Sequence, residues 1–307
     1  MYKRQGLQSI LTKDDEIIIS AMEHHSNIVP WQMLCEKTGA TMKVIPINSD
    51  GTLDIDEYKS MLNPKVKFVF VNHVSNTLGT INPIELIIEL AHKNNSQVLI
   101  DGAQGAAHLK INLKELNVDY YVASAHKLCG PTGVGFLYGK TELLKSLPAY
   151  QGGGEMISNV TFEKTEYADL PHKFEAGTPN IAGVIAFGVA LDYMNSIGFD
   201  NIENHEKELL DYATENLKKI DGIKIYGDNN QKISVISFNI GDHHPSDIGS
   251  ILDQFGIAVR TGQHCTQPIM DFYKIPGTVR ASFSFYNTKS EIDLFIDALI
   301  KASKMLG

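Results

Sequence analysis

Cysteine is scarce in this sequence, with only Cys35, Cys129 and Cys265 in 307 residues. The three cysteines lie far apart and form no C-x-x-C pair, which argues against a disulfide framework and against a cysteine-based zinc site. Isolated free thiols are typical of proteins in a reducing compartment. We therefore expect a cytoplasmic protein without a metal site.

Long apolar runs and blocks of basic residues are also absent. No apolar stretch approaches the roughly 20 residues needed to cross a bilayer, and the N-terminus lacks the continuous apolar segment of a secretory signal. The 36 acidic residues outnumber the 27 basic ones and give a net charge of -9, which disfavours a phosphate backbone as a partner. We expect a soluble protein that binds neither membranes nor nucleic acid.

Short β-rich segments alternate with helix-like segments in the first half of the chain. The strand candidates are residues 16–20, 41–47, 66–71, 96–101, 119–124 and 134–139, and the helix candidates are residues 31–37, 55–62 and 83–92. This alternation is typical of an α/β fold with a mainly parallel sheet. The segments VKFVFV and QVLI are apolar throughout, as expected of strands that are covered on both faces.

The pattern changes after the glycine-rich residues 151–155. A long helical region from about 181 to 220 precedes strand candidates at 232–240, 257–260 and 278–285 and helix candidates at 246–255 and 290–305. These later elements form a smaller α+β unit. The sequence therefore predicts a large domain over residues 1–185 and a small C-terminal domain over residues 186–307.

Asp101 and Lys127 each follow a predicted strand and lie 26 residues apart. Ligands of open parallel sheets bind at the carboxyl ends of the strands, so both side chains can face one pocket. A lysine that forms a Schiff base and an acid beside a pyridinium nitrogen are what pyridoxal phosphate requires. Ser124 and His126 flank the lysine and are natural donors to a phosphate. From these residues alone, a loop-capping Asp101 and a solvated Lys127 stand as an even alternative.

Six motifs resemble, in this order, motifs of the class V aminotransferase family: MEHHSNIVPW, HVSNTLGT, DGAQ, SAHKLCGPTGVG, FEAGTPN and RTGQHCTQP. Within the family they resemble the SufS-type, or group II, cysteine desulfurases. The resemblance implies fold type I of the pyridoxal-phosphate-dependent transferases, with a mainly parallel large domain and a smaller C-terminal α+β domain. It also implies an N-terminal truncation of about a hundred residues, including a phosphate-binding loop at a helix N-terminus.

The resemblance implies the cofactor contacts. Lys127 would bind pyridoxal phosphate covalently and move protons, Asp101 would keep the ring nitrogen protonated, and Gln104 would bind the phenolic oxygen. His24 would stack on the ring and assist proton transfer. A metal-binding pair of His24 and His25 is discounted, because adjacent histidines on a strand point to opposite faces.

Two further residues resemble ligands of the phosphate and of the substrate. Thr178 resembles a phosphate ligand that reaches the site from the neighbouring subunit, which implies a homodimer; locally, its hydroxyl could instead satisfy a turn. Arg280, assisted by Asn76, resembles the residue that binds the substrate carboxylate with a planar guanidinium. A structural acid is the alternative partner of Arg280.

Cys265 resembles the nucleophile of the R-x-G-x-H-C motif. The neighbouring His264 imidazole and Arg260 guanidinium would supply the positive charge that favours a thiolate, and Arg260 would also contact the substrate. Cys35 and Cys129 are interpreted as small buried hydrophobic residues.

Together these roles imply a cysteine desulfurase that converts L-cysteine to L-alanine and leaves a persulfide on Cys265. A SufE- or SufU-like acceptor would take the sulfur for iron–sulfur cluster assembly. L-selenocysteine is an alternative substrate, in a selenocysteine lyase reaction. Another class V enzyme fits less well because of Cys265, and an inactive fragment that only dimerises or binds a partner stays open.

Overall fold

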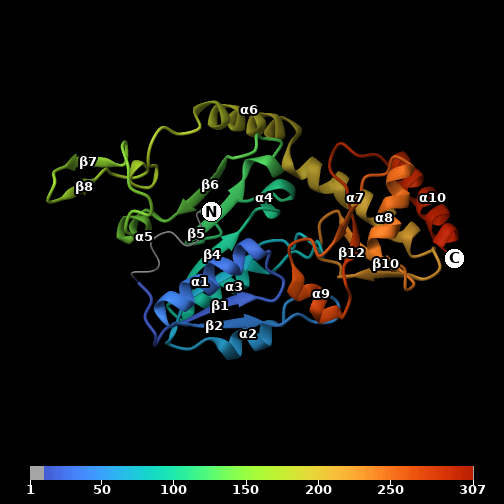
Figure 1. Cartoon of the computed structure of the whole chain (residues 1–307), viewed down its shortest axis with the longest axis horizontal. Helices are drawn as coiled ribbons and strands as arrows, with labels where there is room; N and C mark the ends of the chain where they lie inside the picture. The colour runs from blue at the N-terminus through green and yellow to red at the C-terminus, as the bar shows by residue number, and fades with distance from the viewer. Residues whose placement is uncertain (1–9, 307) are drawn as a thin grey trace.

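The computed structural model describes residues 10–306 and arranges most of them around two sheets (Figure 1). The larger sheet has six strands in the order β2-β1-β3-β4-β5-β6. Their bounds are β1 Glu16–Ser20, β2 Thr41–Ile45, β3 Val66–Asn72, β4 Gln97–Asp101, β5 Tyr120–Ser124 and β6 Gly135–Gly139. All neighbouring strands are parallel except β5 and β6, so the prediction of a mainly parallel sheet is confirmed.

Helices cover both faces of the larger sheet. They are α1 Val29–Thr38, α2 Ile55–Met61 and α3 Ile84–Lys93. Alternate side chains of β1 belong to two different cores: Ile17 and Ile19 lie with Trp31 of α1, whereas Ile18 lies with side chains of α2 and α3. Because successive side chains point to opposite faces of a strand, burial of both faces requires strands that are apolar throughout. This explains the continuous apolar segments of the sequence.

The smaller sheet is antiparallel and comes from the C-terminal part of the chain, in the order β11-β12-β10-β9. Its strands are β9 Ile223–Tyr226, β10 Val235–Ile240, β11 Arg260–Gly262 and β12 Thr278–Ser282, and the helices of this region are α7 Phe199–Leu217, α8 Pro245–Gln254, α9 Gln267–Tyr273 and α10 Lys289–Leu306. Apolar residues of α7, α8 and α10 share one core with β10 and β12. The α+β arrangement predicted for this region is confirmed.

The helical region expected over residues 181–220 consists of two helices. α6 (Ile181–Ile197) and α7 are separated by Gly198, which has a φ of +88°, and the two helices are bent by 72°. Helical periodicity continues across the glycine, so the sequence alone did not predict the break. The predicted boundary at residues 185/186 falls inside α6, whose Phe187 and Met194 belong to a core of the larger sheet. The domain division stays a prediction.

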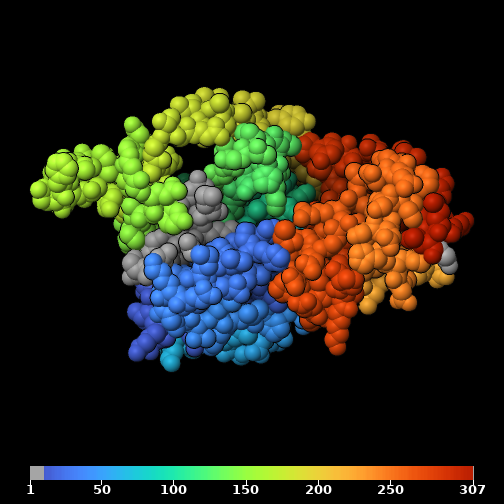
Figure 2. Space-filling view, viewed as in Figure 1, coloured from blue at the N-terminus to red at the C-terminus, as the bar shows by residue number. Residues whose placement is uncertain are grey.

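The remaining elements are short. β7 (Ile157–Val160) and β8 (Thr165–Tyr167) form a hairpin that projects from the body (Figure 2). The short helices are α4 Gly105–His108, α5 Thr141–Ser146 and the 3-10 helices η3 His25–Asn27, η4 Ala125–Lys127 and η5 His172–Phe174. Within residues 10–306 no single helix is long and apolar enough to cross a membrane, and α6 with α7 meets that criterion only as a bent pair.

Candidate active site

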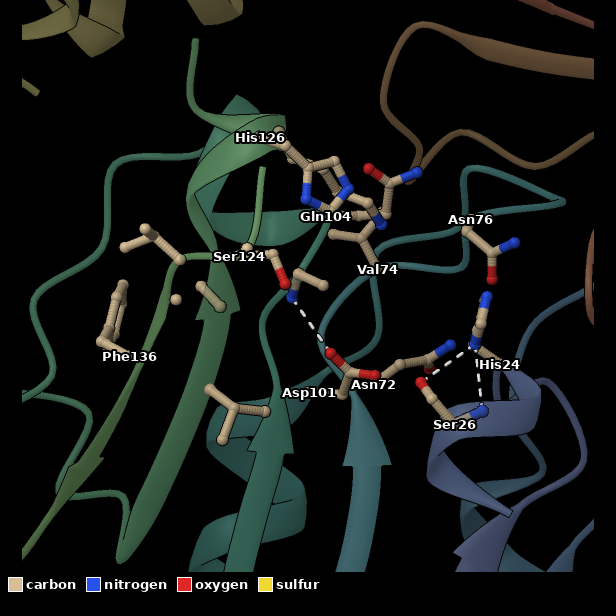
Figure 3. A pocket seen from close by; sticks show the side chains of 17 residues that line it. His24, Ser26, Asn72, Val74, Asn76, Asp101, Gln104, Ser124, His126 and Phe136 are labelled. Atoms are coloured by element: carbon tan, nitrogen blue, oxygen red, sulfur yellow. Dashed lines mark hydrogen bonds between the residues drawn. The ribbon is translucent and has the colours of Figure 1, made fainter. Parts of the chain in front are cut away.

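A cavity of about 500 Å³ opens at the carboxyl ends of β3, β4 and β5 (Figure 3). It is lined by the turn that follows β1, the loops after β3 and β4, and the connection from β5 to β6. Seven residues singled out in the sequence line it: His24, Asn76, Asp101, Gln104, Ser124, His126 and Lys127. The prediction that Asp101 and Lys127 face one pocket is therefore confirmed.

Asp101 is the last residue of β4 and is only 5% exposed. Its Oδ1 accepts a hydrogen bond from the backbone N–H of Ala103 at 3.1 Å. The turn that follows is tightly packed, because a Cβ atom on Gly102 would lie 1.9 Å from the Tyr121 ring and one on Gly105 would lie 2.5 Å from the His73 ring. This packing fixes the turn that carries Gln104.

Lys127 lies on the neighbouring segment. β5 is parallel and adjacent to β4, as the spacing of the two motifs predicted, and η4 follows it directly. Ser124 ends β5 opposite Gly135 of β6, and His126 precedes the lysine in η4. Because the antiparallel β6 returns beside β5, the loop between them closes this side of the cavity.

The residues on this side and at the cavity floor fit pyridoxal phosphate. Lys127 supplies an amine for covalent attachment, and the buried Asp101 carboxylate can accept a hydrogen bond from the ring nitrogen. The Gln104 amide can donate to the phenolic oxygen, and Ser124 and His126 offer donors for a phosphate group.

His24 lies on the opposite side of Asp101 from Ser124 (Figure 3). Its Nδ1 accepts a hydrogen bond from the Ser26 backbone N–H at 3.0 Å, and His24 thereby caps η3. The expectation that His24 and His25 lie on a strand was wrong, because β1 ends at Ser20 and the two histidines enter a 3-10 turn. Within residues 10–306 no group of three or more potential ligands could hold a metal ion.

Cys265 lies in the loop between β11 and α9, with Arg260 beside it. The guanidinium Nη2 of Arg260 is 3.7 Å from the Cys265 sulfur. Both His264 and Cys265 have left-handed backbone conformations, with φ of +53° and +61°. The side chain of Asn76, which lines the cavity, donates from Nδ2 to the His264 carbonyl at 2.8 Å, so this loop is attached to the cavity wall.

The expected contribution of His264 to the charge around the sulfur was wrong. Its ring is 2% exposed and its Nε2 lies 2.9 Å from the Thr278 hydroxyl. Burial, together with Arg280 and Arg260, lowers the pKa of His264 from its usual value of 6.5 to about 4, so the imidazole is neutral at physiological pH. Arg260 is the cation in contact with the sulfur.

Arg280 lies in the middle of β12, where it pairs in register with Arg260 of β11. Its Nη1 donates to the Asn76 carbonyl at 2.7 Å, whereas its buried Nε has no hydrogen-bond partner. Burial and the neighbouring Arg260 lower the pKa of Arg280 to about 10, which leaves it charged at neutral pH. Among the described residues it forms no ion pair with an acid, so the alternative of a structural partner is not realised.

Three other residues singled out in the sequence do not line the cavity. Thr178 is exposed in the loop before α6, and in its own chain it does not line the cavity, so its phosphate role stays a prediction. Cys35 is partly buried and packs against a hydrophobic core, in agreement with its predicted role. The interpretation of Cys129 as a buried residue was wrong, because it is exposed in the loop after η4.

Glu23 and His25 support the site through hydrogen bonds, and neither was predicted from the sequence. Glu23 is completely buried and accepts hydrogen bonds from the Asn72 N–H at 2.9 Å and the Asn27 side chain at 2.6 Å. His25 contacts the Cys265 loop. Asn72 could have been identified from the sequence, because it is a polar residue at the end of an apolar strand. No local sequence signal distinguishes Glu23 or His25.

Known proteins resemble this chain in sequence and in fold. The family model described as aminotransferase class-V matches residues 4–295. A cysteine desulfurase of Cronobacter sakazakii is 48% identical over 300 residues, which is 97% of this chain and 74% of that protein.

Two solved structures extend the comparison. The cysteine desulfurase CsdA (S-sulfonic acid) from Escherichia coli has a TM-score of 0.96 at 36% identity, covering 99% of this chain and 76% of that one. The apo cysteine desulfurase from Thermococcus onnurineus has a TM-score of 0.94 at 36% identity, covering 98% and 75%. The predicted fold and the predicted pyridoxal-phosphate cofactor are thus confirmed as those of the family. By sequence and by structure, the chain belongs to the class V aminotransferase family, among relatives that are cysteine desulfurases.

Proposed function

We propose that the protein is a cysteine desulfurase that converts L-cysteine to L-alanine and receives the sulfur on Cys265. The observation that carries this proposal is that Asn76 joins the two halves of the site. Its side chain lines the cavity that contains Lys127, and it binds both the Cys265 loop and Arg280. Through Asn76, the amine of Lys127, the guanidinium of Arg280 and the thiol of Cys265 would act on one substrate.

The cavity residues would hold and control the cofactor. Pyridoxal phosphate, when bound, withdraws electrons from the substrate α-carbon. Lys127 would attach it and then carry the α-proton, and the Asp101 carboxylate would keep the ring nitrogen protonated. The His24 ring would pack on one face of the cofactor, with Ser124 and His126 at the phosphate.

The paired arginines would orient the substrate. Arg280 and Arg260 face each other across β12 and β11, and the described chain supplies no acid to either of them. A substrate α-carboxylate satisfies the buried Nε of Arg280 and offsets the repulsion between the two guanidinium groups. Asn76 fixes Arg280 for this contact through its carbonyl.

Cys265 would accept the sulfur. Its thiolate attacks the substrate sulfur, a sulfur–sulfur bond forms, and the bond between that sulfur and the substrate β-carbon breaks with its electron pair left on carbon. A proton delivered to that carbon completes L-alanine. The Arg260 guanidinium, 3.7 Å from the sulfur, is placed to stabilise the anionic form of Cys265 before the attack.

A persulfide on Cys265 requires an acceptor for its sulfur. The sulfur must pass to an acceptor before the next turnover, and we propose a SufE- or SufU-like protein of iron–sulfur cluster assembly in a reducing cytoplasm, as for SufS-type enzymes. L-selenocysteine would bind the same groups and serves as a competing substrate. A homodimer would bring Thr178 of one subunit to the phosphate of the other.

Replacement of the nucleophile tests the proposal. Cys265→Ala should retain pyridoxal phosphate, as measured by visible absorbance after gel filtration. Its rate of sulfide release from cysteine under reducing conditions should be at least about a hundredfold lower than that of the wild type. Cys129→Ala is the matched control, since Cys129 is exposed near Lys127, and it should keep wild-type release. Undiminished release by Cys265→Ala would refute the proposal.

A further inference from the structure

His25 connects the turn at the cavity to the loop that carries Cys265. Its backbone N–H donates to the Cys265 carbonyl at 2.8 Å. Its ring Nε2 accepts a hydrogen bond at 3.1 Å from the backbone N–H of Gln267, the first residue of α9. His25 therefore binds the chain immediately at and after Cys265, although the two segments are 242 residues apart in sequence. Figure 2 shows the C-terminal part of the molecule lying directly against the N-terminal part.

The Cys265 loop needs such support. A left-handed conformation in a residue other than glycine is unfavourable and persists only where the surroundings enforce it. His264 and Cys265 adopt it in succession. Asn76 holds the His264 carbonyl, and the hydroxyls of Thr77 and Thr266 are 2.6 Å apart. Thr266 is the N-cap residue of α9, so its contact holds the end of the loop, whereas the contacts of His25 bind the Cys265 carbonyl and the Gln267 backbone N–H.

The same short segment carries the residue that faces the cofactor cavity. His24 caps η3, and His25 is the first residue of that 3-10 turn. His24 lines the cavity, whereas His25 does not. A change in the position of the turn is therefore transmitted to both the cavity wall and the sulfur-bearing loop.

We propose that His25 is a positioning residue that holds the Cys265 loop against the cofactor cavity, so that the sulfur lies within reach of the substrate. The inference rests on the proposed function for its catalytic consequence, but its structural part concerns only contacts within this chain. His25 does not line the cofactor cavity, and its hydrogen bonds to the loop join backbone groups of Cys265 and Gln267. Its contribution is the geometry of the loop.

Two variants of His25 separate loop positioning from general stability. His25→Ala removes the ring acceptor, so the Gln267 amide should exchange its hydrogen at least about tenfold faster. His25→Gln offers a side-chain oxygen at the reach of Nε2 and should restore most of this protection. His172→Ala, at an exposed position in η5, is the control and should leave the exchange unchanged.

Kinetics provide the second readout. With His25→Ala, kcat for sulfur transfer should fall about 10- to 100-fold, while the KM for cysteine and the absorbance of bound cofactor stay near wild type. His25→Gln should recover most of kcat. Unchanged Gln267 exchange in His25→Ala, or an equal loss of bound cofactor, would overturn the inference. A wild-type protein without sulfur transfer would contradict the proposed function, whereas Gln267 exchange would still decide whether His25 holds the loop.

Discussion

The residues at the site differ in how far their roles can be inferred from sequence. Asp101 and Lys127 were found because each follows an apolar strand, and the parallel sheet brings the ends of adjacent strands together. His264 was misread because its neighbourhood in sequence, beside Cys265 and near Arg260, gives no information about burial. In the folded protein its ring points to Thr278 and is neutral.

Glu23 gives a test at the residue scale. Burial raises the pKa of its carboxyl from the usual 4.5 to about 7, against the opposing effect of hydrogen bonds from Ser20, Asn27 and Asn72. The folded protein therefore binds a proton that the unfolded chain has released, and stability is lost as the pH rises from the unfolded pKa through the folded one. Between about pH 5 and about pH 8 this loss should amount to about 2 to 3 kcal/mol.

The Glu23→Gln variant should lack this loss. The free energy of unfolding is measured by urea denaturation at both pH values. The decrease between the two pH values should be about 2 kcal/mol smaller in Glu23→Gln than in the wild type. Glu16→Gln, at the start of β1, is the matched control, because contacts with Lys43 and Asn63 lower the pKa of Glu16, and its carboxyl stays ionised over this range. Equal pH slopes in wild type and Glu23→Gln would show that Glu23 does not titrate as a buried acid.

At the scale of elements, the sequence predicted the strands of the larger sheet, but it did not predict the break between α6 and α7. The central strands β1, β3, β4 and β5 are buried on both faces, so their apolar composition identifies them directly. Gly198 is one of several glycines in and near the helical region, and only its backbone conformation separates it from Gly188 within α6. The backbone conformation of Gly198 depends on how α7 packs against the rest of the protein, and the local sequence gives no information about that packing.

These two glycines make a matched pair for mutation. Gly198→Ala should destabilise the protein by about 1 to 2 kcal/mol, because alanine avoids a φ of +88°. Gly188→Ala should be neutral or stabilising by up to about 1 kcal/mol, since a Cβ there meets no atom within 4 Å and alanine favours the helix. Thermal unfolding of both variants measures the difference. The opposite order of stability would contradict this account of the break.

At the scale of the whole molecule, α6 presents an apolar surface to its surroundings. Ile181, Ile185 and Val189 lie on successive turns and are 58%, 65% and 65% exposed. A contiguous exposed apolar stripe of this kind is typical of an interaction surface. It begins just after Thr178, the residue predicted to reach a neighbouring subunit, which supports α6 as part of the proposed homodimer contact.

A charge placed on this surface tests the dimer. Val189→Glu should raise the dissociation constant of the dimer at least about tenfold, because an unpaired carboxylate would be buried at the contact. Molar mass measured by light scattering over a range of concentrations provides the readout. Leu294→Glu, on the exposed side of α10, is the control and should leave the mass unchanged. A monomeric wild type, or an unaffected Val189→Glu variant, would remove α6 from the interface.

The most direct test of the proposed chemistry is to locate the transferred sulfur. The purified protein is incubated with pyridoxal phosphate and L-cysteine, and its peptides are then analysed by mass spectrometry while alanine is measured in the same sample. We expect alanine, together with one additional sulfur atom on the peptide that contains Cys265 and none on the peptides that contain Cys35 or Cys129. Alanine formed with the sulfur on another cysteine, or neither product formed, would contradict it.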